Sequence, residues 1–166
     1  EAEKARRYVH RWAKLGRSCY TVKDVDAAVA DDQIDFFTVG PSFGGLALFG
    51  RPPGLDLVRH AAAVAPPQAK GAKPWFAIGG ITLTNLDQVL AAGARRVAVG
   101  RAICDADDPG AAAGSFGDRL RAAWGDEMDA FTIDAVGKEG RFRTLGVTRD
   151  DADSPGTTPV DTDPEI

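Results

Sequence analysis

The chain has 166 residues, of which 44% are hydrophobic and 27% are charged, so it carries enough apolar side chains for the core of one domain. Its formal net charge of −4 argues against a nucleic-acid-binding protein, because phosphate contacts normally require a basic surface. No apolar run approaches the roughly 18 residues of a membrane-spanning helix, and no signal peptide is recognisable. The two cysteines, Cys19 and Cys104, match no metal or disulfide spacing, so we expect a cytoplasmic protein.

Helical and strand-like segments alternate along residues 1–124. Apolar residues spaced three or four apart predict helices, and short runs of aromatic and β-branched residues predict strands. The helices are predicted at residues 1–15, 22–29, 54–65, 83–90 and 109–124, and three strands at residues 36–39, 75–78 and 96–99. A fourth strand position, at residues 16–18, fits the alternation but has no such run. This alternation predicts an α/β fold with a parallel sheet of four strands.

Short polar residues and glycine mark the ends of the predicted helices. Thr21 is the expected N-cap of the second helix, and Thr82 or Thr84 that of the fourth, which ends at Gly93. These positions separate each strand from the helix that follows it.

Three aspartates, Asp105, Asp107 and Asp108, precede Pro109 and have two interpretations. They could hold a cation, but aspartate followed by proline is typical of a helix start. We therefore interpret them as an N-cap cluster. The thiol of Cys19 would be a nucleophile only with a base nearby, and no histidine neighbours it in the sequence.

The amino-acid composition changes after residue 124. Residues 125–150 form a variable extension with at most a short strand pair, and residues 151–166 are rich in Asp, Pro, Thr and Gly. This composition predicts a disordered acidic tail.

Two glycine-bearing turns follow neighbouring predicted strands. One is Ala77-Ile78-Gly79-Gly80-Ile81 and the other is Val97-Ala98-Val99-Gly100-Arg101. Backbone amides at strand-to-helix turns of this kind bind phosphate, and two such turns form the phosphate site after strands seven and eight of a (β/α)8 barrel. The alternative is that each glycine pair serves a tight connection and nothing else.

Several strings in the chain together resemble one family, thiamine-phosphate synthase. The string from Lys73 to Ile81 and the string Ala106-Asp107-Asp108-Pro109 are similar to its actinobacterial form. The other matching strings are Gly16-Arg17-Ser18, the run from Asp35 to Phe43, Pro53-Gly54-Leu55, Ala92-Gly93-Ala94, and the run from Val97 to Ile103. The resemblance covers residues 1–124 and corresponds to the downstream half of the family's barrel.

The resemblance implies a partial (β/α)8 (TIM) barrel of thiamine biosynthesis. The family's transferase joins hydroxymethylpyrimidine diphosphate to thiazole phosphate and releases diphosphate, with Mg²⁺ bound. Carried over by position, Ser18 would contact the diphosphate, and Gly79, Gly80, Gly100 and Arg101 would bind the thiazole phosphate. The residues that bind the pyrimidine and the aspartates that hold magnesium would belong to the upstream half of the barrel.

Two departures from the family pattern weaken the expectation of activity. The run Gly44 to Phe49 lacks the hydroxyls and the lysine that grip diphosphate, with Arg51 as the nearest cation, and Cys19-Tyr20 stand where the family has a histidine after the serine. We therefore predict that the isolated chain is inactive. A non-catalytic phosphate-binding or regulatory relative is one alternative. A split half-barrel that needs a partner, either a second copy or a complementary half, is another.

The half-barrel interpretation also predicts which side chains line its inner face. We expect five apolar residues there: Phe37, Val39, Phe76, Ile78 and Val99. An apolar face and two open strand edges would favour association with another chain.

Overall fold

The computed structural model describes residues 2–10, 12–44 and 54–125. The chain divides into two units, Glu1–Met128 and Asp129–Ile166, and all described residues belong to the first. Its elements, in chain order, are α1 (Ala2–Arg6), β1 (Gly16–Cys19), α2 (Val22–Ala30), β2 (Phe36–Val39), α3 (Asp56–Val64), β3 (Trp75–Ile78), α4 (Leu86–Ala91), β4 (Val97–Ala98), α5 (Arg101–Cys104) and α6 (Pro109–Trp124).

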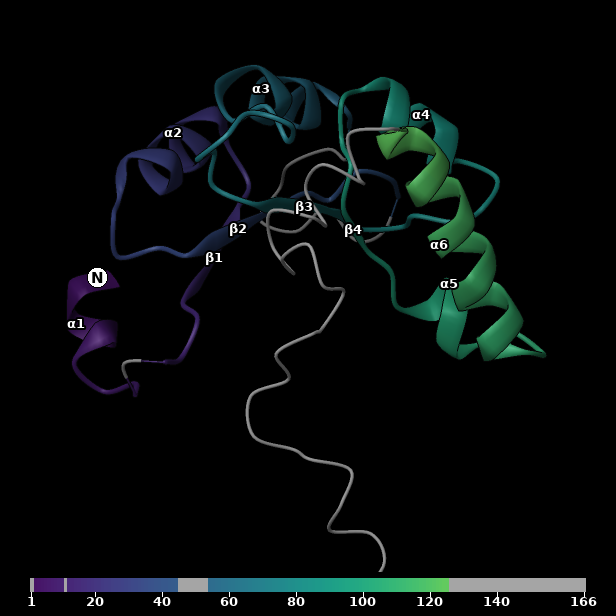
Figure 1. The fold of residues 1–166 in the computed structure, drawn as a ribbon, viewed down its shortest axis with the longest axis horizontal. Coiled ribbons are helices and arrows are strands. Elements are labelled where there is room, and N and C mark those ends of the chain that lie inside the picture. Colours follow the sequence, from purple (N-terminus) through teal and green to yellow (C-terminus); the bar gives the residue numbers. More distant parts are fainter. Residues whose placement is uncertain (1, 11, 45–53, 126–166) are drawn as a thin grey trace, which may run out of the picture. The chain divides into compact units, whose positions relative to one another are not determined.

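The four strands form one parallel sheet in the order β1-β2-β3-β4. Helices α2, α3 and α4 cover one face of it (Figure 1). The predicted α/β class and the parallel four-stranded sheet are therefore confirmed. Because every strand is parallel, all the strand-to-helix turns lie at one edge of the sheet.

The core lies between the sheet and its covering helices. Phe37 of β2 and Trp75 of β3 are both buried there, with ring centroids 6.3 Å apart in a stacked arrangement. The Trp75 indole nitrogen donates to the carbonyl of Ala65 over 2.8 Å, so its polar atom is satisfied inside the core. The remaining strand and helix residues of this layer include Val39, Ala77, Val25, Ala28, Val58 and Ala61.

The prediction for the inner face of the half-barrel is wrong for three of its five residues. Phe37 and Val39 are fully buried in the core, and Val99 packs against that core. Side chains alternate along a strand, so Phe36 and Phe76 lie on the other face, which α2, α3 and α4 leave open. Their rings meet edge to face with centroids 6.0 Å apart, and Ile78 on the same face is 39% exposed.

The N-terminal prediction also needs correction, because the helix expected at residues 1–15 ends at Arg6. Arg6 Nη2 donates to Asp35 Oδ2 over 2.7 Å, and the backbone amide of Leu15 donates to the same oxygen over 2.6 Å. These contacts hold the segment against the start of β2, so a tertiary interaction overrides local helix propensity.

Candidate functional site

A cleft of about 850 Å³ lies at the carboxyl ends of β3 and β4. We call it the glycine-turn cleft, because both predicted turns contribute to its lining. The residues that matter below are Ile78, Gly79, Gly80, Thr82, Gly100, Arg101 and Asp105. Four of the five residues predicted to bind phosphate from the sequence are thus brought together.

Gly79 and Gly80 form the turn after β3 in a conformation that only glycine adopts easily. Their φ values are +101° and +62°. A Cβ atom on Gly79 would lie 2.8 Å from Cα of Pro41, and one on Gly80 would lie 2.9 Å from the carbonyl oxygen of Phe43. The turn is therefore pressed against the segment that follows β2, and side chains larger than hydrogen do not fit between them.

Hydrogen bonds from that segment hold the turn in place. The buried Ser42 donates to the carbonyl of Ile78 from its backbone amide over 2.9 Å and from its hydroxyl over 3.2 Å. The amide of Phe43 donates to the carbonyl of Gly79 over 3.0 Å. Two successive carbonyls of the turn are therefore occupied by donors of the protein itself.

The turn after β4 is more open. A Cβ atom on Gly100 would meet no atom of the described residues within 4 Å, and Gly100 is the N-cap of α5. Its carbonyl accepts from the amides of Ile103, over 2.9 Å, and Cys104, over 3.0 Å. Because α5 has only four residues, any attraction for an anion here would come from local amides and Arg101 rather than from an extended helix dipole.

Two residues of opposite charge line the cleft, and both are exposed. Arg101 begins α5 and Asp105 follows its last residue. Arg101 could make a charge-assisted hydrogen bond to a phosphate, whereas Asp105 would repel one that came close. An anion is therefore best placed on the Arg101 side, next to the glycine turns.

Ser18, the fifth predicted site residue, lies elsewhere. It is exposed on β1, pairs with Thr38 of β2, and does not line the glycine-turn cleft. Its neighbour Cys19 is 1% exposed, and burial raises the pKa of this thiol to about 11. The thiol is protonated at neutral pH, which argues against a role as nucleophile.

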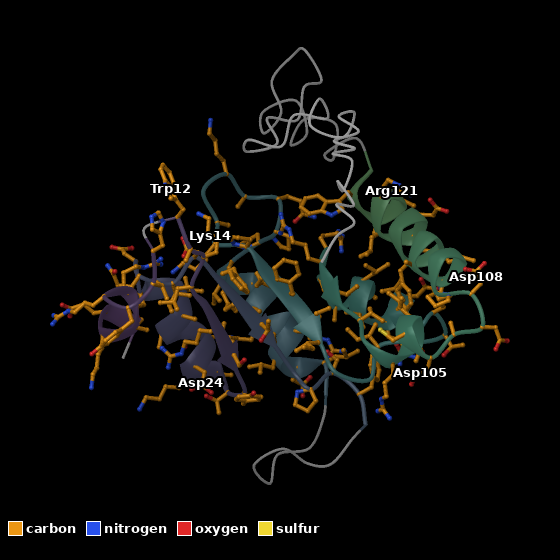
Figure 2. All side chains as sticks on the ribbon, turned by 90° about the horizontal axis from the view of Figure 1, so that it is seen from below. Trp12, Lys14, Asp24, Asp105, Asp108 and Arg121 are labelled. Atoms are coloured by element: carbon orange, nitrogen blue, oxygen red, sulfur yellow. The ribbon has the colours of Figure 1, made fainter. Side chains whose placement is uncertain are left out.

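The aspartate cluster behaves as a helix start. The side chain of Asp108 accepts a hydrogen bond from the amide of Ala111 over 2.9 Å, which confirms the predicted N-cap of α6. Asp105 instead follows the end of α5, and Figure 2 shows both aspartates on the chain between these two helices. Within residues 2–10, 12–44 and 54–125, no three acidic, histidine or cysteine side chains gather in a way that could hold a metal ion.

Sequence reasoning missed one residue at the start of α4. The N-cap is Asn85, so the prediction of Thr82 or Thr84 is wrong. The side chain of Asn85 accepts from the amide of Thr82 over 2.8 Å and donates to the carbonyl of Gly80 over 2.9 Å. Asparagine is a common N-cap, so its residue type was a usable signal, but its contacts with the turn were not visible in the sequence. Ser42 was also missed, because its partner Ile78 is 36 residues away.

Most of the predicted diphosphate loop lies outside the described residues. Only Gly44 of the run from Gly44 to Phe49 is described, and Arg51 is not. Of the extension predicted at residues 125–150 only Gly125 is described, and the acidic tail predicted at residues 151–166 lies outside the described residues. In the part of the chain that the structure describes, no helix has the length and apolar character needed to cross a membrane.

Comparison with known proteins identifies the family of this chain. Residues 1–103 match the family model described as thiamine monophosphate synthase. The chain belongs to this family. The resemblance inferred from the sequence strings is thereby confirmed, and it includes both β1 and the turn after β4.

Curated thiamine-phosphate synthases are similar over the same region. The chain is 56% identical to that of Acidothermus cellulolyticus over 110 residues, which are 66% of this chain and 50% of the relative. It is 52% identical to that of Streptomyces avermitilis over 110 residues, covering 66% and 49%. It is 48% identical to that of Mycolicibacterium smegmatis over 120 residues, covering 72% and 50%. The chain spans about half the length of the curated relatives it matches.

Proposed function

We propose that the glycine-turn cleft binds the phosphate group of thiazole phosphate in a protein of thiamine biosynthesis. The observation that carries this proposal is the convergence of Gly79, Gly80, Gly100 and Arg101 on one cleft. The four residues come from two turns separated by a whole helix, yet parallel pairing of β3 and β4 sets them side by side. Membership of the thiamine monophosphate synthase family is the reason for choosing thiazole phosphate as the ligand.

The chemistry available in the cleft is binding and orientation. Backbone amides and a guanidinium would neutralise part of the phosphate charge, and the apolar side chain of Ile78 would border the thiazole ring. In the family reaction diphosphate departs, a pyrimidine carbocation forms and the thiazole nitrogen captures it, so holding the thiazole nitrogen close to the cation is the contribution required here. No covalent nucleophile is needed.

We further propose that the joining reaction requires residues beyond this chain. The pyrimidine contacts and the magnesium ligands implied by the family would come from a complementary half-barrel, with Ser18 as this chain's own contact with the diphosphate. Among the described residues, helices α2, α3 and α4 leave the sheet face with Phe36, Phe76 and Ile78 uncovered, which supports this proposal because a completed barrel would bury that face. A second copy of the chain is the alternative partner.

A non-catalytic phosphate-binding role is the second candidate. It is favoured by the sequence of the loop from Gly44 to Phe49, which has neither a hydroxyl nor a cation to neutralise diphosphate. Missing charge stabilisation of this kind costs several kcal/mol, or a few orders of magnitude in rate. We therefore expect the isolated chain, with both substrates and Mg²⁺, to make no thiamine phosphate above background. Turnover that is proportional to protein and is lost in Ser18→Ala would contradict this.

Calorimetric titration tests the binding proposal. Thiazole phosphate should bind, and the unphosphorylated thiazole alcohol should bind much more weakly. Arg101→Gln should weaken thiazole phosphate binding about fivefold, because an exposed charge-assisted hydrogen bond contributes about 1 kcal/mol. The matched control is Arg59→Gln on α3, whose side chain is equally cationic but pairs with Asp56 away from the cleft. Equal binding of the two ligands, or equal losses in the two variants, would refute the site.

A further inference from the structure

The side chain of Asn85 makes both of its described hydrogen bonds to the phosphate turn rather than to its own helix. An asparagine at the N-cap normally accepts a hydrogen bond from an amide in the first turn of the helix. Asn85 makes no such side-chain bond to α4, and only its backbone carbonyl accepts from the amide of Gln88, over 3.1 Å. Its side-chain amide instead spans from the carbonyl of Gly80 to the amide of Thr82.

These contacts complete a series along the turn. The carbonyls of Ile78 and Gly79 accept from Ser42 and Phe43, and the carbonyl of Gly80 accepts from Asn85. Three consecutive carbonyls are therefore held by donors from two separate segments. Of these donors, only Asn85 comes from the C-terminal side of the turn, where Ile81 is buried at 4% exposure.

Peptide planarity converts these carbonyl contacts into control over the amides. In a trans peptide the carbonyl and the following N–H are coplanar and point in opposite directions. Holding the carbonyl of Gly80 therefore sets the direction of the N–H of Ile81. In the same way, the carbonyls of Ile78 and Gly79 set the directions of the N–H groups of Gly79 and Gly80. The three residues whose N–H groups are oriented, Gly79, Gly80 and Ile81, all line the glycine-turn cleft. The side chain of Asn85 and the N–H of Ile81 thus lie at opposite ends of the same peptide group, and Ile81 lines the cleft.

We propose that Asn85 is a positioning residue, which fixes the peptide between Gly80 and Ile81 so that its amide is presented to the phosphate of the ligand. This inference rests on the proposed function. It assigns a role in phosphate binding to a residue that does not itself line the cleft. Without the donor to Gly80, the peptide can rotate, because glycine on its N-terminal side imposes little restriction. Binding would then require that the amide be ordered again.

Three variants separate positioning from a structural role at the helix start. Asn85→Asp and Asn85→Ser keep good N-cap residues, whereas Asn85→Ala does not. Asn85→Asp also keeps an acceptor for the amide of Thr82 but loses the donor to Gly80. The control is Thr84→Ala, one residue away, where the exposed residue's hydroxyl bonds the hydroxyl of Thr82.

The full chain is titrated with thiazole phosphate and with the unphosphorylated thiazole alcohol, and thermal unfolding is followed in parallel. We expect all three Asn85 variants to lose about tenfold in affinity for thiazole phosphate. Affinity for the alcohol should be unchanged, because it makes no use of the phosphate turn. The unfolding temperatures of Asn85→Asp and Asn85→Ser should stay near that of the wild type, and Thr84→Ala should bind both ligands normally.

A second readout does not depend on the ligand. By amide hydrogen exchange, Thr82 should be protected in the wild type and should exchange faster in Asn85→Ala and Asn85→Ser, with Asn85→Asp in between. Wild-type affinity in Asn85→Asp and Asn85→Ser would overturn the positioning role while leaving the proposed function intact. A wild-type chain that fails to distinguish the two ligands would instead overturn the proposed function, and this inference with it.

Discussion

Replacing Gly80 with alanine tests how closely the phosphate turn is pressed against the segment after β2. Gly71, in the loop before β3, offers a matched control, because its φ is +80° but a Cβ there would meet nothing within 4 Å. Gly80 has a φ of +62°, and a Cβ would lie 2.9 Å from the carbonyl oxygen of Phe43 and 3.0 Å from that of Gly44. The two variants share the backbone penalty and differ in the steric one.

The magnitudes follow from these two terms. A left-handed conformation costs an alanine about 1–2 kcal/mol, and the lower entropy of the unfolded alanine chain returns about 0.5 kcal/mol. Gly71→Ala should therefore lower the free energy of unfolding by about 1 kcal/mol. At Gly80 the contact with two backbone carbonyls adds an overpacking cost of about 1–3 kcal/mol, for a total of about 2–4 kcal/mol.

Urea unfolding of the full chain, followed by circular dichroism, measures both losses. The unfolding slope should be the same in the wild type and in both variants, so that the midpoints report stability alone. Equal losses in Gly71→Ala and Gly80→Ala would refute the reasoning, since they would mean that the turn is not confined by Phe43 and Gly44. A smaller loss at Gly80 than at Gly71 would refute it more strongly.

Three further outcomes are expected. Lys73 Nζ donates to the carbonyls of Ala28 over 2.6 Å and Asp31 over 2.7 Å at the end of α2, so Lys73→Met should lower the free energy of unfolding by about 2 kcal/mol in the same urea assay, while the exposed Lys70→Met should not. The hydrogen bond from Arg6 holds the pKa of Asp35 at about 2, below its ordinary 3.8, so this carboxylate stabilises the fold above about pH 4 and the contribution is lost as the pH falls towards 2. Asp35→Asn should flatten that part of the acid unfolding curve, and an unchanged curve would contradict the assignment. Within the described residues β1 and β4 each pair on one side only, so light scattering should detect a dimer or a complex, and a stable monomer at micromolar concentration would count against it.

The local features of the fold could be predicted from the sequence because they depend on neighbouring residues. Strands β2, β3 and β4 lie where apolar and β-branched runs predict them, whereas β1 (Gly16–Cys19) has no such run. The side chain of Thr21 accepts from the amide of Asp24 over 3.0 Å, as an N-cap should. The left-handed Gly93 follows α4, as expected for a helix end. The two glycine turns could be placed at one edge of the sheet because parallel strands direct all their carboxyl ends the same way.

The face of each strand could not be predicted, because β2 and β3 carry large apolar residues on both faces. Phe36 and Phe37 are equivalent as a pattern, and only the packing of α2 and α3 decides that Phe37 is buried in the core while Phe36 contacts Phe76 on the open face. The end of α1 could not be predicted for the same reason, because it depends on the contact between Arg6 and Asp35, which are 29 residues apart in the sequence.

The roles of Asn85 and Ser42 likewise depend on the tertiary structure. The sequence identifies the glycines that bend the turn, since their conformational freedom is a property of the residue itself. What holds the turn is a set of hydrogen bonds from both of its sides, and the bond from Ser42 exists only because β2 and β3 are paired in one register. Residue type determined where the chain could turn, and the pairing of the strands decided what the turn is held against.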